Sequence, residues 1–135
     1  MATSQLDYRI QQVAQQDPRY AVAAYHFLFD ALDFTMARLG RNTRVGLDRH
    51  ITVAELLNGI RDHAIEQFGP LARLVFESWG VARTEDFGEI VFHLINAGLL
   101  NSRDDDRRED FEDAYSFREA FDHAYTIDIP WERIA

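Results

Sequence analysis

Four arginines that follow one another around a single loop are the clearest group of chemically active side chains. They are Arg38, Arg41, Arg44 and Arg49, and the only acidic residue among them is Asp48. A guanidinium group binds carboxylates and phosphates through two parallel hydrogen bonds. The cluster therefore fits an anion- or partner-binding loop, and it fits pairing with the acidic tail of the same molecule equally well.

Histidines and carboxylates form a second set of candidate residues. Three pairs are spaced four residues apart, which places both side chains on one helical face: His26/Asp30, Asp62/Glu66 and Glu89/His93. A four-helix di-iron site needs Glu-x-x-His twice, and the nearest element here is the reversed His63-x-x-Glu66. We expect ordinary helix-supporting contacts at these pairs, so no metal ion and no cofactor is implied.

The motifs of known catalytic and nucleotide-binding sites are absent. Asp86-Phe87-Gly88 matches the metal-binding tripeptide of protein kinases, but the sequence lacks the glycine-rich loop, strand lysine and catalytic loop of that fold. P-loop, dinucleotide-binding, nucleophile-elbow and zinc-protease patterns are also missing. We identify no catalytic residue, and this favours a protein that acts by binding.

The composition is that of a single domain without cysteine. With 135 residues, 47% of them hydrophobic, the chain is long enough to close one core. The lack of cysteine excludes disulfides and thiolate chemistry. No apolar run reaches the roughly 18 residues that span a bilayer, and the polar N-terminus is unlike a signal peptide. We therefore expect one cytoplasmic domain over residues 1–135, with no membrane association.

Charge is distributed unevenly along the chain, whose net charge is −9. Residues 1–52 carry six arginines against five acidic residues, whereas residues 53–100 carry three against seven and residues 101–135 five against eleven. An acidic protein is repelled by phosphate backbones. The charge therefore disfavours nucleic acid as the partner.

Helical periodicity and capping residues predict a mainly α fold of about five helices in one compact domain. The expected helices are residues 4–16, 18–39, 53–68, 70–79 and 84–98. Asp17-Pro18 would begin the second helix as an N-cap followed by proline, and Thr52 with Glu55 would form a capping box at the third. Aromatic side chains around most of the second helix indicate a central, buried position.

The fourth and fifth helices each have a predicted buried face. In the fourth helix this face carries Leu71, Leu74, Val75 and Trp79. In the fifth helix Thr84 is the expected N-cap and Gly98 the stop. The outer face of the fifth helix is acidic, with Glu85, Asp86 and Glu89.

The order of the last three helices and the following segment also fits a winged helix. Residues 84–98 would then be the recognition helix and residues 101–113 the wing, followed by residues 115–117. The fold also leaves room for a small C-terminal hairpin. The acidic character of the recognition helix and of the wing suits a protein surface better than DNA. The acidic, aromatic-rich tail, residues 101–135, is expected to fold back onto the helices because its aromatic side chains are poorly suited to water.

Four segments, which cover most of the chain, have a distinctive sequence. They are RYAVAAYHFLFDALDFTMARLG (19–40), HITVAELLNGIRDHAIEQFGPLARLVFESWGV (50–81), TEDFGEIVFHLINAGLL (84–100) and DFEDAYSFREAF (110–121). Together they resemble a small bacterial family of single-domain proteins to which no function is assigned, and the TEDFGEIVF-type segment is the most specific part. The resemblance implies a bacterial, cytoplasmic, stand-alone domain and transfers no functional residue.

These features favour a non-catalytic interaction or regulatory protein that binds another protein or a ribonucleoprotein. Large aromatic side chains dominate the contacts at protein interfaces. The candidate interface anchors are therefore Trp79, Tyr125 and Trp131. The first alternative is a winged-helix-like nucleic-acid-binding protein that uses the loop from Arg38 to Arg49. The second alternative is a metal-dependent or small-molecule enzyme around His26 or His63.

Overall fold

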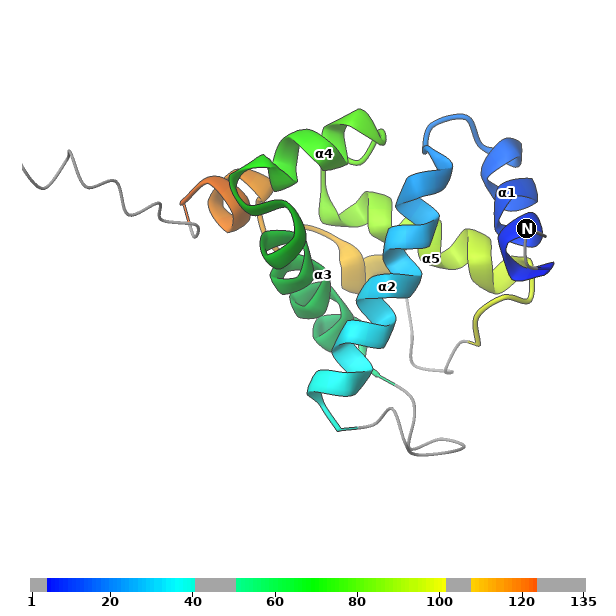
Figure 1. Cartoon of the computed structure of the whole chain (residues 1–135), viewed down its shortest axis with the longest axis horizontal. Coiled ribbons are helices and arrows are strands. Elements are labelled where there is room, and N and C mark those ends of the chain that lie inside the picture. Colours follow the sequence, from blue (N-terminus) through cyan, green and yellow to red (C-terminus); the bar gives the residue numbers. More distant parts are fainter. Residues whose placement is uncertain (1–4, 41–50, 102–107, 124–135) are drawn as a thin grey trace, which may run out of the picture.

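The structure of the chain is a computed structural model that describes residues 5–40, 51–101 and 108–123. Over these residues the chain forms five α-helices: α1 (Gln5–Gln16), α2 (Val22–Arg38), α3 (Val53–Phe68), α4 (Ala72–Ser78) and α5 (Thr84–Asn96). The shorter helical turns are η2 (Gly69–Leu71), η3 (Arg108–Phe111) and η4 (Arg118–His123). α2 lies in the middle and packs against α1, α3 and α5 (Figure 1).

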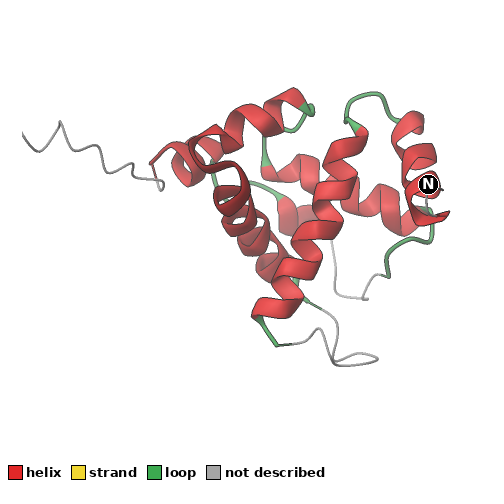
Figure 2. Cartoon of the chain, viewed as in Figure 1, coloured by secondary structure: helices red, strands yellow, loops and turns green. Residues whose placement is uncertain are grey.

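The mainly α prediction is confirmed, because the described residues are helical or connecting and include no strand (Figure 2). The winged-helix detail is not confirmed, because Leu99-Leu100 is a bend after α5 and residues 115–117 lead into η4. Residues 102–107, in the middle of the expected wing, lie outside the described residues. No helix in the described ranges is long and apolar enough to cross a membrane.

The contact between α2 and α3 is unusually close at one point. A Cβ atom at Gly59 of α3 would lie 1.7 Å from Oγ1 of Thr35 on α2, so only glycine fits. The hydroxyl of Thr35 is buried and donates a hydrogen bond to the carbonyl oxygen of Ala31 at 2.7 Å. This arrangement satisfies the buried polar group inside its own helix and lets the two helix backbones approach.

The start of α2 differs from the prediction. The helix begins at Val22 rather than after Asp17-Pro18, because tertiary contacts hold the preceding residues in a turn. Asp17 accepts hydrogen bonds from the backbone and side chain of Arg19. The backbone N–H of Ala21 donates to the carbonyl oxygen of Trp79 at 3.0 Å. These bonds replace the helical ones that the N-cap pattern predicted.

The N-cap of α3 follows the prediction, whereas the N-cap of α5 does not. At α3, Thr52 accepts from the backbone N–H of Glu55, and Glu55 accepts from that of Thr52, which confirms the capping box. At α5, the carboxylate of Asp86 accepts from the backbone N–H of Ala82 at 2.9 Å. Thr84 is buried inside the helix instead of capping it, and its hydroxyl donates to the carbonyl oxygen of Phe111 at 2.6 Å.

The predicted buried face of α4 is wrong by about a third of a turn. Ala72 and Phe76 are buried, whereas Leu71 and Leu74 are 57% and 59% exposed. The chain enters α4 through the 3₁₀ turn η2, and a 3₁₀ turn rotates each residue further than an α-helix does. Leu71 belongs to this turn and Leu74 follows it in α4, and both stay at the surface.

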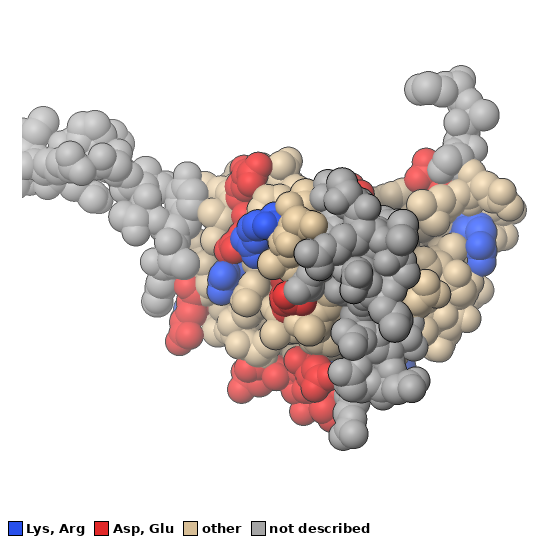
Figure 3. Space-filling view, turned by 90° about the horizontal axis from the view of Figure 1, so that it is seen from below, with Lys and Arg blue, Asp and Glu red and all other residues tan. Residues whose placement is uncertain are grey.

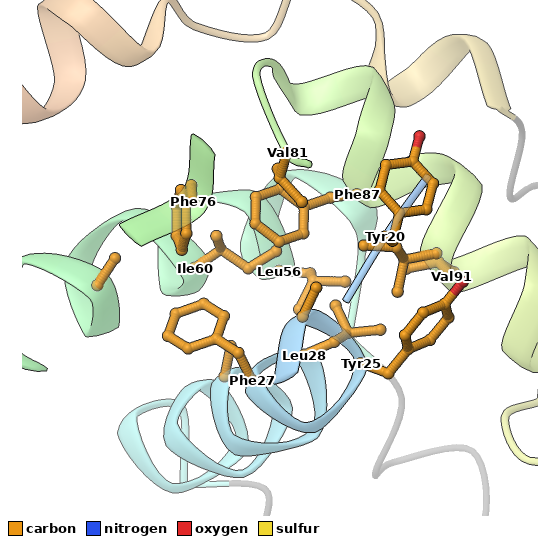
Figure 4. Close-up of a cluster of buried hydrophobic side chains, with 14 of the residues drawn as sticks. Tyr20, Tyr25, Phe27, Leu28, Leu56, Ile60, Phe76, Val81, Phe87 and Val91 are labelled. Carbon is orange, nitrogen blue, oxygen red and sulfur yellow. The ribbon is translucent and has the colours of Figure 1, made fainter. Parts of the chain in front are cut away.

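One end of the core is closed by interlocking aromatic rings, which we call the aromatic cluster. Its members come from α2, α4, α5 and the segment 117–121, and all are buried: Phe27, Phe76, Phe87, Phe117 and Phe121. The ring of Phe76 lies at the centre, with centroids 5.1 to 5.5 Å from the other four. Figure 4 shows Phe27, Phe76 and Phe87 around Ile60 of α3. The segment after η3 therefore packs into the core in place of forming a hairpin.

Candidate functional site

Arg38, the described member of the arginine cluster, is paired within the molecule. Its guanidinium binds the carboxylate of Asp62 on α3 and lies over the ring of Phe34, 5.2 Å from the centroid. Burial raises the pKa of Asp62, but hydrogen bonds from Arg61 and Arg38 outweigh it and leave that pKa lowered. Arg38 thus joins α2 to α3. The other three arginines of the cluster (Arg41, Arg44 and Arg49) lie outside the described residues.

The two histidines of the enzyme alternative do not share a site. His26 is at the surface, where its ring is 42% exposed and Nδ1 lies 3.9 Å from a carboxylate oxygen of Asp7. His63 lies between the rings of Phe27 and Phe34, with centroids 5.4 and 4.9 Å away. Among the described residues, no three His, Asp or Glu side chains lie close enough together to hold a metal ion.

The structure brings together a polar group that the sequence analysis missed. The hydroxyl of Tyr25 lies 2.9 Å from Nδ1 of His93, and Nε2 of His93 lies 3.4 Å from a carboxylate oxygen of Asp17. With a neutral ring, Tyr25 donates to Nδ1 and the N–H at Nε2 points to Asp17. Because His93 is far from Tyr25 and Asp17 in the chain, the sequence related His93 only to Glu89, four residues before it.

The order tyrosine–histidine–aspartate has the connectivity of a catalytic triad, but the tyrosine in the position of the nucleophile is buried. Tyr25 is fully buried, and this burial raises the pKa of its hydroxyl to about 12. A hydrogen bond from Arg19 lowers the pKa of Asp17 to about 2. The hydroxyl is therefore closed to substrate and stays protonated. The contacts of His93 with Tyr25 and Asp17 connect α5 to α2 and to the turn before it.

A cavity of about 510 Å³, which we call the groove, opens between α2, α3 and α5. Its floor is buried and apolar, with Ile51, Leu56, Val91 and Phe111. Its walls are apolar side chains that remain partly exposed: Phe29, Leu32, Met36, Val53, Phe92, Ile95 and Leu100. The volume lies in the range of typical ligand-binding clefts.

Helical spacing explains the walls of the groove. Phe29, Leu32 and Met36 are three and four residues apart, so they lie along one face of α2. Val91, Phe92 and Ile95 have the corresponding spacing on α5. The sequence predicted a central, buried second helix and did not separate a filled apolar face from an open one. One feature of the sequence could have indicated the groove. α2 has aromatic residues on several faces, which is more than a helix that packs on one side requires.

The polar residues of the groove are few. Only Asp33, Thr52 and Asn101 contribute polar side chains to the described lining. Thr52 is already engaged in the capping box with Glu55. Asp33 is exposed on α2 and makes no hydrogen bond or ion pair within the described part of the chain. The site thus combines a large apolar surface with one unpaired carboxylate.

The chain matches no family model, and no curated protein and no solved structure shows significant similarity to it. The family resemblance of the four sequence segments therefore stays a prediction. The functional argument depends on the geometry of the described residues.

Proposed function

We propose that this is a non-catalytic interaction protein that binds an apolar segment of another protein in the groove. The observation that carries the proposal is the cavity of about 510 Å³, whose walls are partly exposed apolar side chains from α2 and α5. Folding normally removes such side chains from water, and a contiguous exposed apolar surface is typical of an interaction site.

The walls suit a helix as the bound segment. From Phe29 to Met36 the α2 wall is about 10 Å long, since an α-helix rises about 1.5 Å per residue. That length matches two turns of a partner helix, whose apolar residues at i, i+3 or i+4, and i+7 would enter the groove. The described residues form no sheet edge to which an extended peptide could add.

Nucleic-acid binding has less support. Arg38 is occupied by Asp62, and the proposed recognition helix α5 carries Glu85 and Glu89 towards its surface. Such carboxylates repel phosphates. A protein partner is therefore the better fit.

The proposal is tested by a comparative pull-down with two matched variants. Ile95→Gln places a polar group on the groove wall, and Leu74→Gln makes the same kind of change on the exposed side of α4. We expect wild type and Leu74→Gln to recover the same defined protein and Ile95→Gln to lose it, with circular dichroism unchanged in all three. Equal recovery by both variants would count against the groove as the binding site.

A further inference from the structure

We infer that the occupant of the groove is a basic amphipathic helix, with lysine or arginine beside its apolar stripe. This inference rests on the proposed function and names the chemistry of the partner. It follows from charge: the groove offers a carboxylate without a partner and no basic side chain in its described lining.

Asp33 is placed to make the specific contact. It lines the groove at the edge of the α2 face that carries Phe29, Leu32 and Met36, so an apolar anchor in the groove brings neighbouring residues of the partner helix to this carboxylate. Lysine and arginine have long apolar stems that can lie along such a wall while the charged end reaches a rim carboxylate. A basic residue next to an anchor therefore gains contact area and an ion pair together.

A described cation beside the groove lining is already engaged. Arg108 lies over the ring of Phe92, 5.3 Å from the centroid, and its Nη1 binds a carboxylate oxygen of Glu89 at 3.2 Å. Arg108 is thus held at Phe92 and Glu89, and within the described part of the chain it makes no hydrogen bond or ion pair with Asp33. An acidic helix would be repelled by Asp33, and Arg108 is already paired with Glu89.

The charge of the described body acts in the same direction at longer range. Over residues 5–40, 51–101 and 108–123 the sequence has eight arginines against seventeen acidic residues, a net of −9. Figure 3 shows acidic side chains in several groups over the described surface seen from below. A body of this charge attracts a cationic segment and accelerates its association. The remaining residues have six arginines and six acidic residues, with three of those arginines in segment 41–50.

The inference is tested with two labelled model peptides of about 18 residues, long enough to form a helix. Both have leucine at the anchor positions, and the remaining positions are mainly lysine in one and mainly glutamate in the other. Fluorescence anisotropy at low and at physiological salt measures their affinity for the full chain. We expect the leucine–lysine peptide to bind at both salt concentrations and the leucine–glutamate peptide to bind at neither.

Two α2 variants separate the specific contact from general charge. Asp33→Asn removes the carboxylate of the groove, and Asp30→Asn removes an exposed carboxylate from the same helix outside the groove lining. We expect Asp33→Asn to weaken binding of the leucine–lysine peptide roughly two- to fivefold, the usual range for one exposed ion pair. Asp30→Asn should have a clearly smaller effect. Equal effects of the two variants would overturn the assignment of Asp33.

The remaining outcomes distinguish this inference from the proposed function. If Ile95→Gln abolishes binding of the leucine–lysine peptide while Asp33→Asn leaves it unchanged, the groove is the site and the assignment of Asp33 is wrong. If both peptides bind equally well and Ile95→Gln abolishes both, the groove is the site and its preference for basic helices is wrong. If the leucine–glutamate peptide binds better, the inference is overturned. If Ile95→Gln changes the affinity of neither peptide, the proposed function fails as well.

Discussion

The aromatic cluster and the groove are built from the same kinds of residue on the same helices, but only one of them is filled. α2 supplies Phe27 to the aromatic cluster and Phe29 to the groove, and α5 supplies Phe87 to the first and Phe92 to the second. In the cluster every ring is buried against other rings. In the groove the side chains stay partly exposed around an open volume.

The difference lies in what covers each region. The aromatic cluster is completed by Phe117 and Phe121, which the segment after η3 brings back against α4. In the described residues, Phe111 reaches the floor of the groove, and no comparable pair of side chains fills the space above it. The comparison indicates that apolar surface in the cluster stabilises the fold, whereas apolar surface in the groove remains available to a partner.

The sharpest test of the comparison is truncation at the centre of the aromatic cluster. Phe76→Ala should lower the free energy of unfolding by about 3 to 5 kcal/mol, because it removes a fully buried ring and leaves a cavity. Urea denaturation measures the change. Since this variant can be too unstable to purify, Phe76→Leu serves as a milder form with a loss of about 1 to 2 kcal/mol. A loss below that for both would show that the cluster is not the core.

A second prediction concerns the contact that sets the distance between α2 and α3. Gly59→Ala should lower the free energy of unfolding by about 1 to 3 kcal/mol, because the added Cβ overlaps Oγ1 of Thr35. The double variant with Thr35→Ala removes the overlapping atom and should recover part of the loss. If the single variant is as stable as wild type, the close approach of the two helices is wrong.

The third prediction applies to the groove itself. Ile95→Gln should change the free energy of unfolding by only about 1 kcal/mol, since Ile95 is already partly exposed to water. The same denaturation experiment gives the comparison with Phe76→Leu. A loss at Ile95 as large as that of Phe76→Ala would contradict the distinction between filled and open regions.

The smallest expected effect is the pH dependence of the turn before α2. Because Arg19 lowers the pKa of Asp17 to about 2, below its unfolded value of about 3.9, the folded state favours the ionised carboxylate. Its stabilising contribution is present above about pH 4 and is lost as the pH falls towards 2. Thermal unfolding of wild type and Asp17→Asn between pH 2 and 5 should show a weaker pH dependence for the variant. Parallel curves would exclude this contribution.

Local signals in the sequence predicted the helices better than they predicted the contacts between the helices. The capping box of Thr52 and Glu55 and the stop at Gly98, whose φ is 75°, are determined by residues within a few positions, and both are confirmed. The start of α2 and the role of Thr84 depend on partners far away in the chain, namely Trp79 and Phe111. Contacts between residues far apart in the chain cannot be predicted from the spacing of neighbouring residues.

The candidate site was out of reach for a similar reason. The apolar faces of α2 and α5 were visible in the sequence, but an apolar face looks the same whether the fold fills it or leaves it open. Deciding between the two requires the position of the segment after α5. The arginine cluster was visible as well, yet the pairing of Arg38 with Asp62 depends on how α2 crosses α3.

Methyl NMR on the full chain tests most directly whether the groove is the binding surface. The leucine–lysine peptide is titrated into protein labelled at leucine and isoleucine methyl groups. We predict saturable shifts at Leu32, Ile95 and Leu100 of the groove, with little change at Leu28 and Ile60 in the core. Shifts confined to other surfaces, or spread evenly over the molecule, would contradict the account.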